Sequence, residues 1–561
     1  MKKNKLFSFD VFDTCLARLC GEPRNLFEVL SLKLYNPEER EGIETLRQMF
    51  VTARMKTTGK DLEDIYYNIS LTLHLPFTIA EMVRIELETE REMLVPIINT
   101  LQLVNGLRKC GKIMFITDMY LPESFIIDIL QQYGFYHEGD ALYVSESVGA
   151  SKRSGDLFRL IHSQLGIPYK NWHHYGDNKH GDYQIPNKLG IHAHLITSEN
   201  MPYEQQWKCY PTVHYPIGSI LSGISSSINA SHDFPNDLMS FVCGFSAPLM
   251  VSWVVSILEY SLNQGITRIY FCARDTHSQF LIAKTLARCN KKYHNLDIRY
   301  LFISTQAIND KLCLEYLIQE GVASTNESVA IVDSRGRGFF SNNINILLSR
   351  NGYRKAYLFM LQLCVTEEYD QISIAGNNRM VVLHNVAYTK TLQNKVNAIE
   401  DIGWMIENLL SLNYHCKTIG YEIMGGRIRP LFSNESPEIE ASNLRKLKKY
   451  QDSLLQEYAT AYSTCGLTMF NDSIIPTLII PTVSSIATHP PKQLLSYLTR
   501  FSIYGKRNRY VHNLFHFMKT KGGHWTNGCI YYTFPYSIAR YVVMAERIIR
   551  KVTRKCPAFQ S

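Results

Sequence analysis

Residues 5–14 read Lys-Leu-Phe-Ser-Phe-Asp-Val-Phe-Asp-Thr, an apolar run that leads into two carboxylates and a hydroxyl. The apolar run predicts a buried strand, and side chains that follow a strand of a parallel sheet face the crevice where ligands bind. Asp10 is therefore a candidate nucleophile at a sheet edge. Taken alone the pattern is weak, because an aspartate after a strand also serves in an ordinary turn. The interpretation depends on whether partners for the nucleophile follow along the chain.

Four such partners occur in order, each at the end of a predicted strand or in the loop that follows one. The predicted strands are 112–116, 141–144 and 172–175. A phosphoryl-transferring aspartate needs a hydroxyl for the phosphate, a fixed cation that screens it, and further carboxylates for Mg²⁺. The sequence offers these groups as Thr117, Lys152, Asp177 and Asp182. Together with Asp10, they predict a magnesium-dependent phosphotransfer site.

Strands and helices alternate through this part of the chain, which predicts a doubly wound α/β domain over residues 1–205. Between the first two strands, residues 21–104 read as helical. Charged and apolar residues recur there at spacings of three and four, most clearly in 38–54 and 79–94. We therefore expect a helical insertion of roughly 80 residues after the first strand.

The four motifs resemble those of the haloacid dehalogenase superfamily of phosphotransferases. The resemblance implies that Asp10 is the nucleophile, Thr117 the hydroxyl of the second motif and Lys152 the lysine of the third. Asp177 and Asp182 then form the acidic fourth motif, and Asp10, these two residues and the backbone carbonyl of Phe12 hold Mg²⁺. The helical insertion resembles the cap that covers small substrates in this superfamily.

One position departs from the family pattern. Phosphatases of the superfamily usually carry an acid/base aspartate two residues after the nucleophile, where this chain has Phe12. Asp13 stands one step further, where glycine is common. General acid/base help is typically worth about 10²- to 10⁴-fold in rate. Three interpretations follow: Asp13 or a cap residue donates the proton, the domain is a slow phosphatase, or it binds phosphate without turnover.

The composition is that of an ordinary soluble protein with more than one domain. The chain has 561 residues, 45% hydrophobic and 20% charged, with a net charge of +8 and thirteen scattered cysteines. The charge is too diffuse to indicate nucleic acid, and the cysteines predict a reducing compartment without a zinc cage. We expect a cytoplasmic protein. The uncharged stretch 238–258 is interpreted as a buried helix, with a membrane span as the alternative.

A second α/β pattern follows a Pro-, Gly- and Ser-rich stretch at 206–232, which we interpret as a linker to a second domain over 233–561. Its predicted strands 269–273, 298–303 and 328–332 each end in polar residues. Arginines, glycine-rich backbone and a carboxylate at strand ends suit a sugar phosphate or diphosphate. The candidate substrate-binding residues are Arg274, Asp275, Ser304, Arg335, Gly336, Arg337 and Gly338, and Asp333 is the candidate catalytic residue.

Both halves together resemble the dual-domain ribofuranosyltransferases of bacterial O-antigen and capsule synthesis. The resemblance rests on segments 8–14, 117–121, 151–155, 270–275 and 332–334. It implies that 5-phosphoribosyl-1-diphosphate gives its phosphoribosyl group to a lipid-linked glycan, and that the N-terminal domain then removes the 5-phosphate. It also implies a transferase fold that differs from that of nucleotide phosphoribosyltransferases.

Other readings stay open. Glu407 is a candidate acceptor base or a solvated helix carboxylate, and His512, His524 and Trp525 either line an acceptor groove or pack at a domain edge. The basic residues of 536–555 suggest peripheral contact with the cytoplasmic face of the inner membrane, or a helix in water. The functional alternatives are another glycosyltransferase joined to a phosphatase-like domain, and a non-catalytic scaffold.

Overall fold

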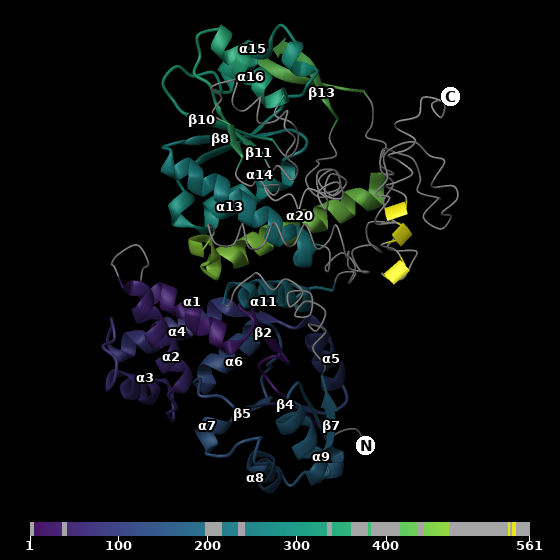
Figure 1. The fold of residues 1–561 in the computed structure, drawn as a ribbon. Helices are drawn as coiled ribbons and strands as arrows, with labels where there is room; N and C mark the ends of the chain where they lie inside the picture. Colours follow the sequence, from purple (N-terminus) through teal and green to yellow (C-terminus); the bar gives the residue numbers. More distant parts are fainter. Residues whose placement is uncertain are drawn as a thin grey trace. The chain divides into compact units, whose positions relative to one another are not determined.

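The computed structural model describes residues 5–35, 42–196, 216–233, 242–333, 339–360, 380–382, 416–434 and 441–470, with three residue pairs between 537 and 545. The chain divides into two compact units. Unit 1 comprises Met1–Phe234 with Thr464–Leu467, and unit 2 comprises Pro235–Ser463 with Thr468–Ser561. Both units belong to the predicted α/β class, and each contains a five-stranded parallel sheet (Figure 1).

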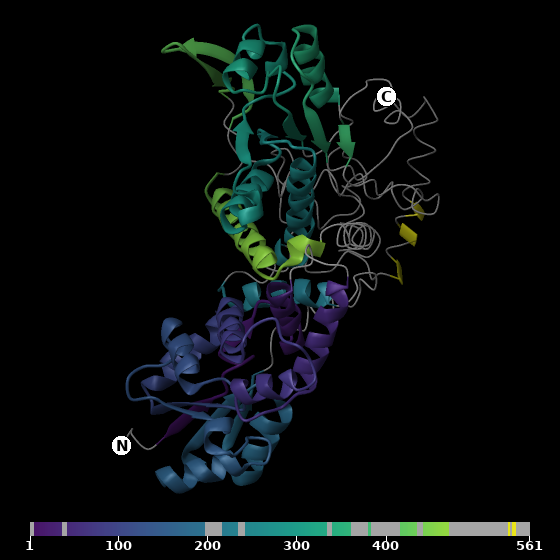
Figure 2. The ribbon, with the colours of Figure 1, turned by 90° about the vertical axis from the view of Figure 1, so that its left-hand side faces the viewer.

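The sheet of unit 1 has the strand order β5-β4-β1-β6-β7, and all four pairings are parallel. Its strands are β1 (Leu6–Phe9), β4 (Lys112–Thr117), β5 (Ala141–Val144), β6 (Trp172–Gly176) and β7 (His192–Leu195). The chain enters this sheet through β1, drawn in dark purple near the N-terminus (Figure 2). The order reverses between β1 and β6, and ligands bind at such a switch point, outside the carboxyl ends of the strands.

The helical insertion leaves the sheet after β1 and returns through a short antiparallel pair, β2 (Leu16–Arg18) with β3 (Leu94–Pro96). Between these strands lie α1 (Pro23–Leu34), α2 (Ile43–Lys56), α3 (Leu62–Ser70) and α4 (Ile79–Met93), which gather in one group (Figure 1). Thr78 and Glu81 form a capping box at the start of α4. The predicted insertion extended to residue 104, but α5 (Ile98–Arg108) contacts β4 and already belongs to the crossover between strands.

Further helices of unit 1 flank its sheet. They are α6 (Glu123–Gln132), α7 (Ser145–Val148), α8 (Asp156–Leu165), the π-helical turn η2 (Lys179–Gln184) and α9 (Ile185–Leu189). The apolar side of α8 packs on Leu6, Met114, Ile116 and Trp172, which project from one face of the sheet. Side chains alternate along a strand, so Phe9 and Phe115 project from the opposite face.

The predicted linker at 206–232 is wrong for its second half, because α11 (Ile217–Ala230) is a largely buried helix of unit 1. Its serines made the composition resemble that of a linker. Inside the helix, however, the Ser225 hydroxyl donates a hydrogen bond to the Leu221 carbonyl one turn earlier, at 3.1 Å. Gly223 lets the helix backbone approach the chain at Gly21, since a Cβ there would lie 2.3 Å from the Gly21 nitrogen. Residues 206–215 lie outside the described ranges.

The sheet of unit 2 has the strand order β12-β11-β10-β8-β9, again with parallel pairings. Its strands are β8 (Arg268–Cys272), β9 (Asp297–Leu301), β10 (Val329–Asp333), β11 (Tyr357–Met360) and β12 (Met380–Val382). Along the chain this order reads 2-1-3-4-5, the flavodoxin-like arrangement, whose switch point lies between the first and third strands. In this unit those strands are β8 and β10.

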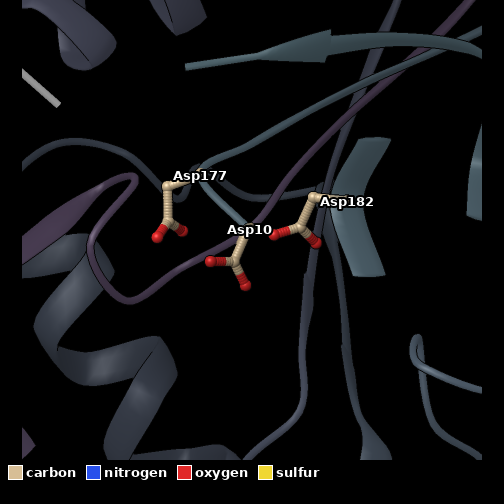
Figure 3. A group of neighbouring side chains, drawn as sticks. All are labelled: Asp10, Asp177 and Asp182. Atoms are coloured by element: carbon tan, nitrogen blue, oxygen red, sulfur yellow. The ribbon is translucent and has the colours of Figure 1, made fainter. Parts of the chain in front are cut away.

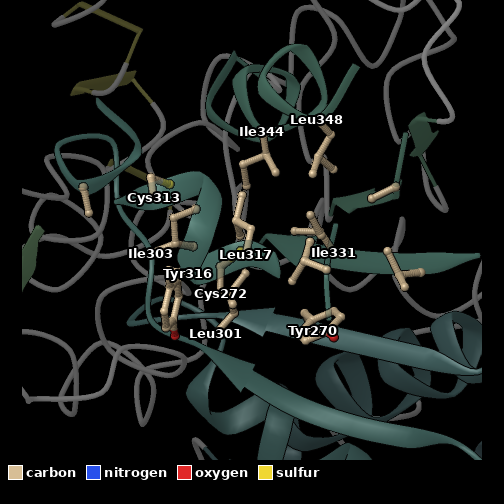
Figure 4. Packing of buried hydrophobic residues seen from close by; sticks show 14 of the residues in the cluster. Tyr270, Cys272, Leu301, Ile303, Cys313, Tyr316, Leu317, Ile331, Ile344 and Leu348 are labelled. Carbon is tan, nitrogen blue, oxygen red and sulfur yellow. The ribbon is translucent and has the colours of Figure 1, made fainter. Parts of the chain in front are cut away.

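Helices cover both faces of this second sheet. On one face α15 (Cys313–Gln319) and α16 (Phe339–Arg350) pack against alternate side chains of the strands, including Tyr270 and Ile331 (Figure 4). On the other face Phe280 of α14 (His277–Cys289) meets Phe271 with ring centroids 6.3 Å apart. The unit also contains α13 (Ala247–Asn263), the hairpin β13 (Thr418–Met424) with β14 (Arg427–Phe432), and α20 (Ala441–Thr464).

The uncharged stretch 238–258 overlaps α13, whose residues 247–258 are all buried, as expected for a core helix. Among the described residues, no helix combines the length and the apolar character needed to cross a membrane. Most of the basic segment 536–555 lies outside the described ranges, as do Glu407, His512, His524 and Trp525. The predictions made for those residues stay predictions.

Candidate active site

Three aspartates meet at the switch point of unit 1 (Figure 3). Asp10 follows β1, Asp177 follows β6, and Asp182 lies in η2, one turn further. One carboxylate oxygen from each residue lies within 4.8 Å of the other two, and Asp10 and Asp182 are buried. Because β1 and β6 are neighbours, the parallel register carries the ends of both strands to the same edge. The structure thus brings together three carboxylates that the sequence singled out.

Asp182 is fixed by several groups that leave its carboxylate little freedom. The backbone N–H of Asn178 donates to Oδ2 at 3.1 Å, and Nε2 of the buried His174 lies 3.2 Å from Oδ1. Behind His174, its Nδ1 contacts the Ser8 hydroxyl at 2.7 Å. Gly176 provides the space, because a Cβ there would lie 2.4 Å from the Asp182 carboxyl carbon. A larger residue than glycine at the end of β6 would therefore displace Asp182.

Lys152 inserts its ammonium between two of the carboxylates. Nζ forms ion pairs with Asp10 and, at 2.7 Å, with Asp182, and the lysine side chain is only 6% exposed. The loop that carries it is held by Asp118, whose carboxylate accepts the backbone N–H of Lys152 at 2.8 Å. Asp118 thus positions the lysine through its backbone. Among the described residues, no hydrogen bond is seen between the Asp118 carboxylate and the carboxylates of Asp10, Asp177 and Asp182. Lys152 therefore supplies a fixed positive charge between Asp10 and Asp182.

Burial and neighbouring charges shift the pKa values of the three carboxyl groups in different directions. Burial raises the pKa of Asp10 well above its ordinary value, against the opposing pull of Lys152, and the nearby Asp182 and Asp177 add to the rise. Burial would also raise the pKa of Asp182, but the hydrogen bond from His174 and the charge of Lys152 outweigh it and lower that pKa. Burial chiefly raises the pKa of Asp177 as well. Within one compact group, the pKa of Asp182 therefore moves in the opposite direction to the pKa values of Asp10 and Asp177.

Two threonines lie at this edge. The Thr14 hydroxyl reaches Asp177 Oδ1 at 3.1 Å and Asp10 Oδ2 at 3.3 Å, so it links the first and fourth motifs. Thr117 ends β4 beside β1 and is buried, in the place predicted for a phosphate-binding hydroxyl. The backbone carbonyl of Phe12 stays a predicted ligand.

The departure at positions 12 and 13 has a defined structure. The Phe12 ring is buried beneath the Arg18 guanidinium, whose carbon lies 4.6 Å from the ring centroid. Asp13 adopts a left-handed conformation with φ 60°, which asparagine and aspartate tolerate better than most residues. Asp13 as a whole residue is exposed to solvent. The protein atoms around its carboxyl group raise the pKa of that group to about 6, against the opposing charge of Arg18. Asp13 is thus a titratable group beside Asp177.

Two buried Arg–Glu pairs join the helical insertion to this region. Arg18 donates to Glu90 of α4 at 2.6 Å, and Arg54 of α2 donates to Glu86 at 2.7 Å, with all four side chains at most 3% exposed. The Arg54 guanidinium also lies 4.8 Å from the ring centroid of Tyr120, which follows Thr117 in the chain. The insertion therefore reaches the second motif through charged and aromatic side chains.

The chain is similar in part to several solved structures of the haloacid dehalogenase (HAD) family. A HAD-family enzyme of Bacteroides thetaiotaomicron, in complex with magnesium and inorganic phosphate, is 14% identical with a TM-score of 0.26 and covers 35% of this chain and 95% of its own. A HAD phosphatase of Thermococcus onnurineus is 15% identical with a TM-score of 0.27 and covers 35% and 87%.

The putative HAD-hydrolase YfnB of Bacillus subtilis, bound to magnesium, is 16% identical with a TM-score of 0.26 and covers 34% and 87%. No family model and no curated protein matches the chain. At these identities and TM-scores, the function has to be inferred from the residues of the site.

Unit 2 places several predicted residues at its own switch point. Arg274 and Asp275 follow β8, and Asp333 ends the adjacent β10. Asp333 and Asp275 both raise the pKa of the Cys272 thiol, after burial, so the two carboxylates lie near the end of β8 together. Ser304 follows β9, and its hydroxyl donates to the Thr418 carbonyl of the hairpin at 2.7 Å. Arg335, Gly336, Arg337 and Gly338 lie outside the described residues.

The sequence did not reveal several residues that shape these sites. His174 holds Asp182 and Asp118 holds the loop of Lys152, but the sequence analysis gave neither residue a role, although His174 lies in a predicted strand and Asp118 in the segment 117–121. In unit 2, Lys448 and Asp452 of α20 contact Ser278 at the start of α14. They lie 170 and 174 residues from it along the chain, so only the fold brings them together.

Proposed function

We propose that unit 1 is a phosphate-monoester hydrolase with Asp10 as its nucleophile. The observation that supports this most strongly is the arrangement at the β1–β6 switch point, where Asp10 pairs with a buried lysine and has two more carboxylates within 4.8 Å. Phosphate-monoester hydrolysis is very slow without a catalyst, and a covalent aspartyl intermediate divides it into two easier steps.

The residues fit a bound Mg²⁺. Asp10, Asp177 and Asp182 supply the hard oxygen ligands that this ion prefers, from side chains that already converge within 4.8 Å. When bound, the ion would supply positive charge that neutralises the phosphate and the nucleophile together. We propose these three carboxylates as its protein ligands.

The chemical steps then use the residues of unit 1. The Asp10 carboxylate attacks phosphorus, the bond from phosphorus to the substrate oxygen breaks, and the alcohol leaves with a proton from Asp13. Lys152 and Thr117 hold the phosphoryl oxygens, and water then hydrolyses the acyl phosphate to release inorganic phosphate. Asp13 supports this role because it is open to solvent, titrates near neutral pH and lies beside Asp177. Phe12, whose ring is buried under Arg18, has no proton to give.

We further propose that unit 2 transfers a phosphoribosyl group from 5-phosphoribosyl-1-diphosphate to a hydroxyl of a lipid-linked glycan, and that unit 1 then removes the 5-phosphate. The support is the switch point of unit 2, where a cation at Arg274 and the carboxylates Asp275 and Asp333 follow neighbouring strands. Such a site suits an anionic sugar donor with ribose hydroxyls. Diphosphate leaves readily once neutralised, so the step needs mainly electrostatics and a positioned acceptor.

The test uses labelled 5-phosphoribosyl-1-diphosphate, a total lipid-linked glycan fraction and the full-length protein. Wild type should yield dephosphorylated ribosyl product, Asp10→Asn should accumulate the 5-phosphorylated product, and Asp333→Ala should stop ribose addition. Asp233→Asn, an exposed aspartate, is the matched control and should behave as wild type. Fully dephosphorylated product from Asp10→Asn would contradict the division of labour, and no incorporation by wild type would favour a different sugar donor or a scaffold.

A further inference from the structure

A buried serine, lysine and aspartate connect α20 to the switch point of unit 2. The Ser278 hydroxyl donates to Asp452 Oδ1 at 2.8 Å, Lys448 Nζ donates to the same oxygen at 2.6 Å, and Nζ also contacts the Ser278 hydroxyl. Further along, Thr285 bonds to Gln456 and Asn290 to Ser463, so the two helices run parallel for the length of α14. The cluster lies at the start of α14, directly after the β8 loop.

A hydroxyl, a buried lysine and a carboxylate resemble a serine–lysine nucleophile, and burial lowers the pKa of Lys448. Access decides against that role, because Ser278 is 1% and Lys448 6% exposed. A substrate could not reach the hydroxyl. The lysine and the serine instead hold one oxygen of Asp452 in a fixed direction.

The other oxygen of Asp452 faces a partly exposed side chain. Oδ2 lies 3.8 Å from Nε2 of His277, whose side chain is 21% exposed. The His277 ring meets Tyr300 of β9 edge to face with centroids 5.6 Å apart. Arg274 and Asp275 precede His277 in the same loop, at the carboxyl end of β8. The charged and titratable groups recorded around His277 in the described residues are thus Asp452 and Lys448 from α20, Tyr300 from β9, and Arg274 and Asp275 from its own loop.

We propose that His277 is the general base of unit 2 and that Asp452 is the residue that positions it. This inference rests on the phosphoribosyl transfer proposed above. In the transfer, the acceptor hydroxyl gives its proton to the His277 imidazole while its oxygen bonds to C1 of the ribose. The bond from C1 to the diphosphate oxygen breaks, and the electron pair leaves with the diphosphate. Asp452 stabilises the imidazolium that forms, and water later takes the proton.

The experiment measures donor binding and transfer separately in the full-length protein. His277→Asn should bind 5-phosphoribosyl-1-diphosphate within about 2-fold of wild type by calorimetry, while transfer to the total lipid-linked glycan fraction falls about 10²- to 10⁴-fold. Imidazole added to His277→Gly should restore part of the rate. Asp452→Asn should move the acidic limb of the pH–rate profile, where the general base becomes protonated, to lower pH, because removing a nearby carboxylate lowers the pKa of an imidazole. His294→Asn, an exposed histidine of the same unit, is the control.

The outcomes separate this inference from the function on which it rests. If wild type transfers no ribosyl group, the proposed transfer fails and the role of His277 fails with it. If wild type transfers but His277→Asn is equally active, only the general base is wrong. Loss of donor binding in His277→Asn, together with no rescue of His277→Gly by imidazole, would assign the histidine to binding or packing and would also overturn the inference.

Discussion

Replacing Lys152 with methionine removes the cation between Asp10 and Asp182 while keeping a side chain of similar length. The carboxylate oxygens of the cluster lie within 4.8 Å of one another. Two unit charges at that separation repel each other by roughly 3–4 kcal/mol at an effective dielectric constant of about 20. Without the lysine this repulsion favours a protonated, non-nucleophilic Asp10. Since each 1.36 kcal/mol is tenfold in rate, phosphatase activity should fall roughly 10²- to 10³-fold.

The assay is steady-state hydrolysis of ribose 5-phosphate in saturating Mg²⁺, with calorimetric titration of Mg²⁺ alongside. Lys188→Met, at an exposed lysine of α9, controls for loss of a surface charge. Lys152→Met keeps all three carboxylates, so it should bind Mg²⁺ at least as tightly as wild type. A variant that keeps more than about a third of the wild-type rate, or that loses Mg²⁺ binding together with activity, would refute the role given to the lysine.

Three further changes test neighbouring parts of the site. The pKa of Asp13 is raised to about 6, so the protonated donor is lost as pH rises and kcat should fall above that pH. Asp13→Asn should lose this limb of the pH–rate profile. An unchanged profile in Asp13→Asn would exclude Asp13 as the proton donor. Gly176→Ala places a Cβ against Asp182 and should weaken Mg²⁺ binding in calorimetry, with about 1–3 kcal/mol lost in stability; unaltered affinity would contradict the packing. Arg54→Met leaves Glu86 buried without its ion-pair partner, so the free energy of unfolding in urea should fall by about 3–5 kcal/mol. The control Arg84→Met, at an exposed ion pair, should lose under ~1 kcal/mol. Equal unfolding midpoints for the two variants would contradict the stabilising role of the buried pair.

The gathering of Asp10, Asp177 and Asp182 could be predicted because local pattern and topology coincide there. Asp10 and Asp177 each follow a short apolar strand, and parallel neighbours bring such ends to one edge regardless of the chain between them. The same reasoning placed Arg274 and Asp333 at the edge of the second sheet. Strand β7 was missed because its histidines and partly exposed residues lack a strand's apolar run.

What could not be predicted depends on contacts between distant segments. Lys448 and Asp452 lie on a polar helix, where a charged pair four residues apart reads as a solvated surface. Their burial against Ser278 follows only from the packing of α20 on α14. The predicted linker failed for a related reason: the glycine at 223 looked like flexibility, but it serves a close approach to Gly21.

The covalent role of Asp10 can be tested by trapping the acyl phosphate that it should form. Full-length protein is mixed with ribose 5-phosphate and Mg²⁺, quenched in acid during turnover and reduced with borohydride, which converts an aspartyl phosphate to homoserine. Peptide mass spectrometry should find homoserine at position 10 in wild type and in Asp13→Asn, and none in Asp10→Asn. Turnover without homoserine at position 10, or with homoserine at another aspartate, would contradict the central claim that Asp10 is the nucleophile.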